Sequence, residues 1–410
     1  MMGGHEAVIT PEWEDAMDKV ITEIGANPKA EAVQTVEASD DDAIKANSKS
    51  NVKSKRVLIC GAKGLGKSTF LRVLIRKLLN EILNSCEFFD TDIGQCEFTP
   101  SGLLSLHTLR RSDQLYVREG EITTAEQWGY HEADGCRFVG DSSPRIHPTV
   151  YMNGVRELLD CHRQNNSGAP LLVNTHGWVV GMGANLVAGI VAAVQPDIII
   201  HIKVQGRPDE LYLDDMISNK GVLLLRINPG IPNANPQSAA LLRYRRLVRY
   251  FLGDSVPLGT LAFGNWLSNS SPLCIRSDKL RILDATGKEP LPRPYIYMAL
   301  NGALVGLVAS SIKNQCIGLG VVRSIGCNEI DGARVIFLLT PEPYTKLEKV
   351  DTIVLGTQRL PLDLAYANHR IQADAPYLLT SSVELVGVEG SKKANRRNLK
   401  RFRLKHLYAK

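Results

Sequence analysis

The order of apolar and polar positions divides the chain into a part that alternates strands with helices and a part made of short strands. Between residues 56 and 254, short apolar runs typical of buried strands alternate with stretches whose apolar residues recur at helical spacing. The predicted strands span residues 57–60, 85–90, 137–139, 171–174, 198–203 and 222–227, and the predicted helices begin at 69 or span 148–161 and 183–194. This alternation predicts an α/β domain with a doubly wound parallel sheet, covered by helices on both faces.

After residue 254 the pattern changes to short apolar runs separated by Gly, Pro and Asn, which predicts a smaller β-rich domain over residues 255–391. The predicted strands span residues 259–263, 295–300, 303–308, 318–322, 334–339 and 351–355. Asn301 and Gly302 predict a hairpin turn inside the uncharged run 295–312. We therefore interpret that run as two buried strands, and 179–202 as a helix, a turn and a strand, so no membrane partner is expected.

The first 55 residues predict one helix followed by a disordered linker. Residues 11–24 place Trp13, Met17, Val20 and Ile24 at helical spacing, whereas residues 31–53 are polar and low in apolar content. Eight cysteines are scattered without a C-x-x-C pair, which argues against a structural zinc site or a disulfide framework and favours a reducing compartment.

The positive charge of the chain is concentrated at its end. The formal net charge is +5, but residues 392–410 hold nine Lys or Arg and no acidic residue, and the remaining chain has 39 basic against 43 acidic residues. A basic tail of this kind attracts nucleic-acid phosphates. It could equally be a targeting signal or a docking segment.

A phosphate-binding loop follows the first predicted strand. The residues Gly61-x-x-x-x-Gly66-Lys67-Ser68 stand between a strand and a helix, and the predicted nucleotide-binding residues are Gly61, Ala62, Lys63, Gly64, Leu65, Gly66, Lys67, Ser68 and Thr69. Glycines let backbone N–H groups face an anion, and the helix N-terminus adds partial positive charge. Lys67 would reach the β- and γ-phosphates, and the Ser68 hydroxyl would contact Mg²⁺. The alternative is a glycine-rich turn with a chance Lys-Ser pair.

Two carboxylates, Asp90 and Asp92, close the second predicted strand, which we expect next to the phosphate loop. One can hold the metal's water shell, and the other can accept a proton from an attacking hydroxyl, as phosphoryl transfer requires. The alternative is that they only solvate the end of the strand.

A third candidate site, 174–183, follows the predicted strand at 171–174. Gly177 allows close backbone approach, Thr175 offers a hydroxyl, and Trp178 could stack on a base or pack in the core. His176 is interpreted as an ordinary loop histidine.

The fourth candidate site is a predicted helix over residues 241–252. It places Leu241, Tyr244, Val248, Phe251 and Leu252 on one face, with Arg243, Arg246 and Arg249 on the other side. Such a helix can lower arginines onto phosphates as a lid. A solvated basic face is the alternative.

These four sites, in this order, resemble those of the polynucleotide 5′-hydroxyl kinase family, which uses a P-loop NTPase fold. The run Gly94-Gln95-Cys96-Glu97-Phe98-Thr99-Pro100 and the C-terminal segments 318–323, 339–343 and 396–398 resemble the nucleolar pre-rRNA-processing branch. The resemblance extends from about residue 56 to the end. It implies an enzyme that uses ATP and Mg²⁺ to phosphorylate the 5′-hydroxyl end of RNA, in the nucleus and nucleolus, during processing of the pre-rRNA internal transcribed spacer and maturation of the large ribosomal subunit.

The resemblance also implies roles for single residues. Ser68 and Asp90 would organise Mg²⁺, and Asp92, helped by Gln95, would orient and deprotonate the 5′-hydroxyl. Thr175, Gly177 and Trp178 would clasp the substrate, while Arg243 and Arg246 would close over the phosphates. An endonuclease that cuts the spacer is the implied protein partner.

The family carries an N-terminal β domain that helps to hold the nucleotide base, and with 55 residues before the kinase domain we expect that domain to be missing or reduced. Three other functions compete. A non-catalytic ATP-binding scaffold of an RNA-processing complex remains open. A GTPase is disfavoured because Asn219-Lys220-Gly221-Val222 lacks the Asp that reads guanine. A small-molecule kinase fits the clasp and the basic tail less well.

Overall fold

A computed structural model of the chain describes twelve stretches of the sequence. They are residues 9–25, 54–113, 131–165, 167–204, 206–217, 221–230, 238–253, 260–284, 286, 299–327, 331–358 and 360. The predicted disordered linker, the Asn219-Lys220 pair and the basic tail at 392–410 lie outside these residues.

The phosphate-loop part of the chain is built on a seven-stranded sheet with the order β4-β3-β2-β5-β1-β6-β7. Its strands are β1 (Arg56–Gly61), β2 (Ser85–Asp90), β3 (Leu103–Arg110), β4 (Gly135–Phe138), β5 (Leu171–Asn174), β6 (Ile198–Ile202) and β7 (Leu223–Ile227). The strands β2, β5, β1, β6 and β7 run parallel, which confirms the doubly wound parallel core. At one side of the sheet, β3 pairs antiparallel with β2 and with the edge strand β4, and β3 was not predicted.

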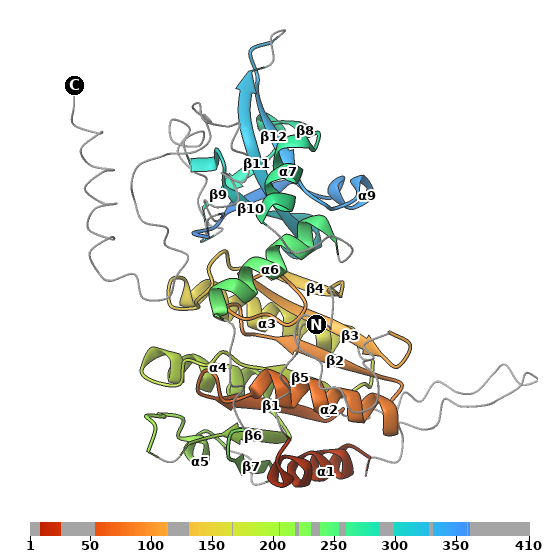
Figure 1. The fold of residues 1–410 in the computed structure, drawn as a ribbon, viewed down its shortest axis with the longest axis vertical. Helices are drawn as coiled ribbons and strands as arrows, with labels where there is room; N and C mark the ends of the chain where they lie inside the picture. The colour runs from red at the N-terminus through yellow and green to blue at the C-terminus, as the bar shows by residue number, and fades with distance from the viewer. Residues whose placement is uncertain are drawn as a thin grey trace, which may run out of the picture.

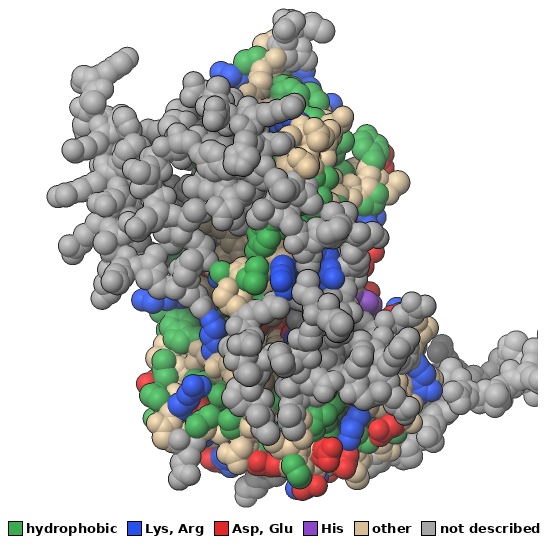
Figure 2. Space-filling view, viewed as in Figure 1, with side chains coloured by type: hydrophobic (Ala, Val, Ile, Leu, Met, Phe, Trp, Pro, Cys, Tyr) green, Lys and Arg blue, Asp and Glu red, His purple; other side chains and the backbone are tan. Residues whose placement is uncertain are grey.

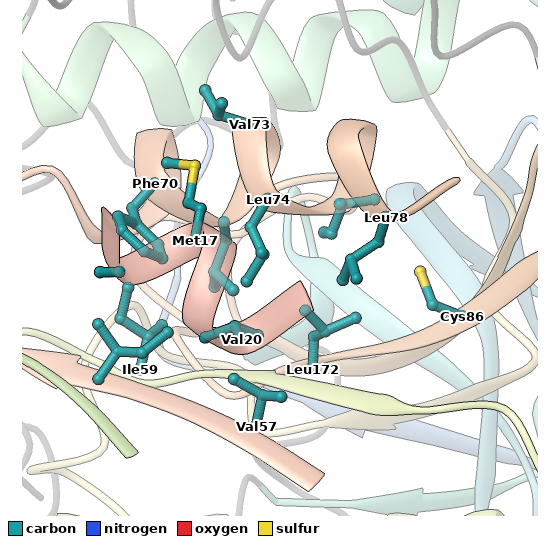
Figure 3. Close-up of a cluster of buried hydrophobic side chains, with 14 of the residues drawn as sticks. Met17, Val20, Val57, Ile59, Phe70, Val73, Leu74, Leu78, Cys86 and Leu172 are labelled. Atoms are coloured by element: carbon teal, nitrogen blue, oxygen red, sulfur yellow. The ribbon is translucent and has the colours of Figure 1, made fainter. Parts of the chain in front are cut away.

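Helices cover both faces of this sheet, as predicted. Its helices are α1 (Pro11–Gly25), α2 (Lys67–Glu81), α3 (Pro148–Asn165), α4 (Met182–Val194) and α5 (Leu213–Met216). Alternate residues of β1 point to opposite sides, so Val57 and Ile59 pack under α1 and α2, whereas Leu58 packs under α3 and α4. Figure 3 shows Met17 and Val20 of α1 lying between α2 and the sheet. The predicted N-terminal helix is therefore present and buries its apolar face, which includes Trp13 and Ile24.

The C-terminal part forms a six-stranded sheet with the order β8-β12-β11-β10-β13-β9. Its strands are β8 (Leu273–Arg276), β9 (Arg281–Leu283), β10 (Leu304–Ala309), β11 (Gln315–Cys327), β12 (Arg334–Leu339) and β13 (Thr352–Leu355). All its pairs are antiparallel except β13 with β9. A short helix, α9 (Tyr344–Leu347), and the 3₁₀ turns η1 (Ser277–Lys279) and η2 (Ser310–Ile312) lie between strands.

Two strand predictions in this part are wrong. The segment predicted as a strand at 259–263 belongs, where it is described, to helix α7 (Thr260–Asn269), because Phe263, Trp266 and Leu267 recur at helical spacing and pack on one cluster. Residues 299 and 300 are helical rather than the end of a strand. A turn is present at 301–302, where Gly302 has a φ of 71°, but it leads from the helical residues 299–300 to β10, so the predicted hairpin between two strands is wrong.

Helix α6 (Ala239–Leu252) joins the two sheets (Figure 1). A single apolar cluster includes Leu247, Val248 and Phe251 of α6, Leu103 of β3 and Cys136 of β4, together with residues of β10, β11 and β12. The buried face of α6 therefore differs from the predicted one: Leu247 and Tyr250 are buried, whereas Leu241 is exposed. The predicted domain boundary at 254 lies outside the described residues, so it stays a prediction.

No helix among the described residues is long and apolar enough to cross a membrane.

Candidate active site

The phosphate loop connects the end of β1 to the first residue of α2. Gly64 and Gly66 have φ values of 78° and 94°, in a region of backbone conformation that favours glycine. Gly66 is the N-cap of α2, and no side chain caps the helix there. The amides of the first turn of α2 therefore stay available to an anion at the positive end of the helix dipole.

Lys67 is buried although it is charged, with 7% of its surface exposed. Its Nζ donates hydrogen bonds to the carbonyl oxygens of Gly61, at 2.9 Å, and Ala62, at 3.2 Å. Burial lowers the pKa of Lys67, and the negative charge of Asp92 partly restores it. The ammonium group thus lies inside the loop and interacts electrostatically with Asp92, which follows β2.

The two carboxylates lie at the same edge of the sheet as the loop, but β5 separates their strand from β1. The prediction that they stand on the strand next to the phosphate loop is therefore wrong in detail. The carboxyl ends of parallel strands meet at one edge, so Asp90, Asn174 and Gly61 end neighbouring strands there. Asn174 Nδ2 donates to Asp90 Oδ1 at 3.1 Å, which ties the two strand ends together.

Asp90 is held by donors on both of its oxygens. Besides Asn174, the backbone N–H of Asp92 donates to Oδ1 at 3.1 Å, and that of Glu97 donates to Oδ2 at 2.7 Å. Burial, followed by the charges of Asp92 and Glu97, raises the pKa of Asp90 to about 8, although the two backbone hydrogen bonds act in the opposite direction. This carboxyl group is rigid, and a positive charge placed beside it would favour its ionised form.

Asp92 is half-buried and is held through one oxygen. The backbone N–H groups of Gly94 and Gln95 donate to Oδ1 at 3.0 and 3.2 Å. Burial raises the pKa of Asp92, and the charge of Lys67 counteracts part of that rise. The Gln95 side chain is half-buried one turn further along the same loop.

The predicted clasp lies against the phosphate loop. The backbone N–H of Lys63 donates to the carbonyl oxygen of Gly177 at 3.0 Å, and a Cβ added to Gly177 would come within 2.6 Å of Lys63 Cα. The Thr175 hydroxyl donates to the carbonyl oxygen of Ile59 at 2.8 Å and is fully buried. Trp178 is half-buried, and its ring and carbonyl cover Gly183 at the start of α4, where a Cβ would lie within 2.3 Å.

His176 lies in a loop, as predicted, but it is buried, with 3% of its surface exposed. Burial, followed by the charge of Lys67, lowers the pKa of His176 to about 3, so its ring is neutral. The backbone N–H of Trp178 donates to Nδ1 at 3.3 Å, and Nε2 has no partner among the described residues.

The arginine helix α6 faces the same site. Arg246 Nη2 lies 3.8 Å from Glu97 Oε2, and Arg243, one turn earlier, is half-buried. Lys and Arg side chains, in blue in Figure 2, are visible at the level of α6 between the two sheets. Of the predicted lid arginines, the structure therefore places Arg246 beside the acidic loop.

Comparison with known proteins identifies both parts of the chain. Residues 61–253 match the family model "mRNA cleavage and polyadenylation factor CLP1 P-loop", and residues 268–361 match "NOL9-like, C-terminal domain". Among curated proteins, polynucleotide 5′-hydroxyl-kinase NOL9 of Arabidopsis thaliana is 29% identical over 74% of this chain and 85% of its own length. The NOL9 kinase of Danio rerio is 27% identical over 81% of this chain. Both parts of the chain are therefore similar to polynucleotide 5′-hydroxyl kinases and their relatives.

A solved structure agrees with these matches at the level of the fold alone. A chain in the solved structure of a wild-type Clp1p–Pcf11p complex aligns with a TM-score of 0.54 and 16% identity, over 76% of each chain. The chain spans 50% of the Danio rerio relative and 52% of the Homo sapiens relative. The two matched regions come in the same order along the chain as the motifs on which the sequence resemblance rests.

Kinases that use ATP are expected to use Mg²⁺ with it. The residues at this site fit a Mg²⁺ ion. Asp90, Asp92 and Ser68 offer oxygen ligands at one edge of the sheet, and Asn174 Oδ1 is buried there with no partner among the described residues. No group of three His, Cys, Asp or Glu in the described part of the chain forms an all-protein metal site. Mg²⁺ is typically bound through one or two carboxylates plus substrate phosphates, which needs no such cage.

Two further site residues were not predicted, Glu97 and Arg72. Glu97 is 2% exposed and Arg72 is 9% exposed, and Arg72 donates to both carboxylate oxygens, from Nε at 2.8 Å and from Nη2 at 3.0 Å. The sequence held one signal: Arg72 interrupts the apolar run Phe70-Leu71-Arg72-Val73-Leu74, and a buried arginine in a kinase fold needs an acidic partner.

Proposed function

We propose that this protein transfers the γ-phosphate of ATP to the 5′-hydroxyl end of RNA. The observation that carries the proposal is the meeting of Lys67 and the Asp90–Asp92 pair at one edge of the sheet, where the charges of Lys67 and Asp92 act on each other. In the proposed reaction, this arrangement would put a phosphate-binding ammonium group and a basic carboxylate at one reacting centre.

In the reaction, the 5′-oxygen of RNA forms a bond to the γ-phosphorus, the bond from that phosphorus to the β–γ bridging oxygen breaks, and ADP leaves. Asp92 accepts the proton of the 5′-hydroxyl, a role that its raised pKa suits because a stronger base takes the proton more readily. Gln95 would help to orient the hydroxyl. Lys67, the loop amides, Arg243 and Arg246 would stabilise negative charge on the transferring group.

Ser68 and Asp90 would hold Mg²⁺, which supplies positive charge at the β- and γ-phosphates. Thr175, Gly177 and Trp178 would form the wall that the substrate meets. Two of these residues would act indirectly. The Thr175 hydroxyl donates to the backbone of β1, and Trp178 packs on Gly183, so both would shape the clasp rather than bind the substrate through those groups.

The finer biological setting rests on resemblance. The names NOL9 and the match to the NOL9-like C-terminal domain support a nucleolar role in pre-rRNA spacer processing and large-subunit maturation. An endonuclease as protein partner follows from the same resemblance. The basic tail at 392–410 would add attraction for RNA.

The test is transfer of label from γ-labelled ATP to RNA and DNA oligonucleotides that carry a 5′-hydroxyl. Lys67→Ala should abolish labelling, and Asp92→Asn should lower turnover at least 100-fold, by the typical worth of an acid–base group, while ATP binding stays largely intact. Lys77→Ala is the matched control, because Lys77 lies on the same helix but pairs with Asp18 at the surface.

Two results would overturn the assignment. Labelling by Lys67→Ala at the wild-type rate would remove the phosphate loop from the reaction. ATP binding by the wild-type chain without any labelled product would instead favour the non-catalytic scaffold. If Asp92→Asn lost ATP binding, Asp92 would be a residue of the metal site rather than the base.

A further inference from the structure

Residues 356–358, which follow β13 of the C-terminal sheet, are hydrogen-bonded to loops of the phosphate-loop part of the chain. The backbone N–H groups of Thr357 and Gln358 both donate to the carbonyl oxygen of Gly140, at 2.8 and 3.1 Å. Gln358 Nε2 donates to Ser101 Oγ at 2.9 Å. Gly140 comes two residues after β4, the edge strand that lies on the side of the C-terminal sheet (Figure 1). The two sheets are therefore joined here by direct hydrogen bonds as well as by α6.

The contact is close because a glycine stands on each side of it. A Cβ added to Gly356 would come within 2.6 Å of the Gly140 carbonyl oxygen, and a Cβ added to Gly140 would come within 2.7 Å of Gly356 Cα. Gly140 also has a φ of 72°, which favours glycine. The Thr357 hydroxyl adds a hydrogen bond to the Asp141 carboxylate. The position of the loop after β4 is thus tied to the position of residues 356–358.

From this junction, backbone hydrogen bonds lead to the residue beside Asp92. The N–H of Gly140 donates to the carbonyl oxygen of Gly102 at 3.0 Å, and the N–H of Gly102 donates to the carbonyl oxygen of Ile93 at 2.8 Å. Ile93 directly follows Asp92, and its side chain is fully buried. Because peptide units are planar and stiff, a displacement at Gly140 is passed through Gly102 to the acidic loop.

The loop after β4 also lies against the amides that hold the Asp92 carboxylate. The backbone N–H groups of Gly94 and Gln95 donate to Asp92 Oδ1, at 3.0 and 3.2 Å. A Cβ added to Gly94 would come within 2.6 Å of the carbonyl oxygen of Ser142, which belongs to the same loop as Gly140. Movement of this loop would therefore change the space in which Asp92 is held.

We infer that residues 356–358 are a positioning element for Asp92, which acts through the loops at 101–102 and 140–142 and does not itself touch the substrate. The inference rests on the proposed role of Asp92 as the base. A misplacement of a reacting group by about 1 Å, caused from a distance, can lower a rate about 100-fold. The C-terminal sheet then contributes to the chemical step. A sheet that only docked RNA would change the affinity for RNA instead.

The chain offers a matched control in Gln315. Gln315 Nε2 of β11 donates to the carbonyl oxygen of Asp134 at 3.3 Å, so this side chain also joins the two sheets. Asp134 precedes β4 and Gly140 follows it, so the contacts of Gln315 and Gln358 lie at opposite ends of one strand. Both glutamines are half-buried. Removing either amide weakens the junction, but the contact of Gln315 lies away from the bonds that lead to Asp92.

The first test is the rate of phosphate transfer to 5′-hydroxyl RNA by the full chain. Gln358→Ala should lower kcat about 3- to 10-fold, and Gly356→Ala about 10- to 100-fold, because its methyl group must push Gly140 away. Gly356 has no positive φ, so the contact alone resists the alanine. KM for ATP and for RNA should change less than about 3-fold in both variants, and Gln315→Ala should keep the wild-type kcat.

Two further measurements separate positioning from a general loss of stability. Because the effect passes through Asp92, adding Gln358→Ala to Asp92→Asn should lower kcat no further, whereas independent effects would multiply. Hydrogen exchange of the amides in residues 92–102, followed by mass spectrometry, should be at least about 3-fold faster in Gln358→Ala than in the wild type. In Gln315→Ala it should keep the wild-type rate.

Wild-type kcat in folded Gln358→Ala would overturn the inference, as would an equal loss of kcat in Gln315→Ala. Multiplied effects in the double variant, or unchanged exchange of residues 92–102 in Gln358→Ala, would overturn it too. If Gly356→Ala does not fold, Gln358→Ala still decides. Failure of the proposed function is a separate result: a wild-type chain that labels no RNA contradicts the kinase proposal, while the exchange measurement needs no activity and decides whether residues 356–358 hold the acidic loop.

Discussion

Asp90 and Asp92 are two residues apart, but the protein holds their carboxylates differently. Asp90 accepts three hydrogen bonds over both oxygens, whereas Asp92 accepts two on Oδ1 and faces the charge of Lys67. A fully bonded carboxylate is suited to a fixed structural or ligand role. Both pKa values are raised, but Asp92 has one less constrained oxygen, which suits it to accept a proton. The different surroundings therefore favour the proposed division of roles, with Asp90 toward the metal and Asp92 as the base.

Burial also produces a pH dependence at single residues, and His107 gives the clearest case. His107 is fully buried beside Phe98, with ring centroids 4.9 Å apart. Burial, followed by the charge of His131, lowers the pKa of His107 to about 3. The unfolded chain binds a proton at about pH 6.5 and the folded chain does not, so stability falls as the pH falls from about 6.5 toward 3.

We therefore expect His107→Phe to be less sensitive to acid than the wild type. Between pH 7 and pH 5, the free energy of unfolding of the wild type should fall by about 2 kcal/mol more than that of His107→Phe, because only the wild type can protonate this ring on unfolding. Urea unfolding at the two pH values measures the difference. If both proteins lose the same stability, the ring is already protonated in the folded state.

At the scale of elements, α1 is part of the phosphate-binding structure rather than an appendage. Trp13 Nε1 donates to the carbonyl oxygen of Asn228 at 2.8 Å, and its ring stands edge-on to Phe70 of α2 at 5.2 Å. A Cβ added to Gly66 would come within 2.7 Å of the Trp13 ring. The indole therefore supports the phosphate loop from behind and links it to the strand β7.

Trp13→Ala should destabilise the protein by about 3–5 kcal/mol, the usual cost of deleting a buried aromatic ring, and should weaken ATP binding because Gly66 loses its support. Chemical unfolding and nucleotide titration measure the two effects. Lys19→Ala, on the exposed face of α1, should stay within about 0.5 kcal/mol of the wild type. A loss below 1 kcal/mol for Trp13→Ala would mean that α1 does not hold the loop.

At the scale of the whole molecule, contacts with the C-terminal sheet fix α6, the helix that we propose as a lid. The Tyr250 hydroxyl of α6 accepts from the backbone N–H of Leu319 at 2.8 Å and donates to Glu342 Oε1 at 2.8 Å. Lys346 pairs with Glu342 and with Glu132, which precedes β4. The position of Arg246 over the acidic loop therefore depends on contacts with a second sheet far along the chain.

Tyr250→Phe should lower the free energy of unfolding by about 1–3 kcal/mol, because the buried N–H of Leu319 loses its acceptor. Tyr344→Phe is the control: Tyr344 is 69% exposed, so the same loss of a hydroxyl should have little effect. Thermal unfolding of both variants makes the comparison. Equal stability of the two variants would mean that the Tyr250 contacts do not anchor α6.

Several elements could be predicted because their signals are local. The phosphate loop needs glycines between a strand and a helix, and β5 and β12 match their predicted bounds because each is a continuous apolar run. Strand β3 was missed because Ser105 and His107 interrupt its apolar pattern, although both are buried in the sheet. The strand predicted at 259–263 was wrong because a short apolar run does not distinguish a strand from a helix.

The sequence by itself determined the phosphate loop, the acidic pair, the clasp, the arginine helix and their order, because each is a short motif whose chemistry depends on neighbouring residues. Only the tertiary structure decided which strand separates the loop from the carboxylates, which face of α6 is buried, and that Arg72, Glu97 and Arg246 meet. Those facts depend on strand order and on contacts between residues far apart in the chain. Periodicity along a single sequence does not encode which buried charge meets which partner, because the desolvation and pairing of a charge are set only when the packed surfaces come together.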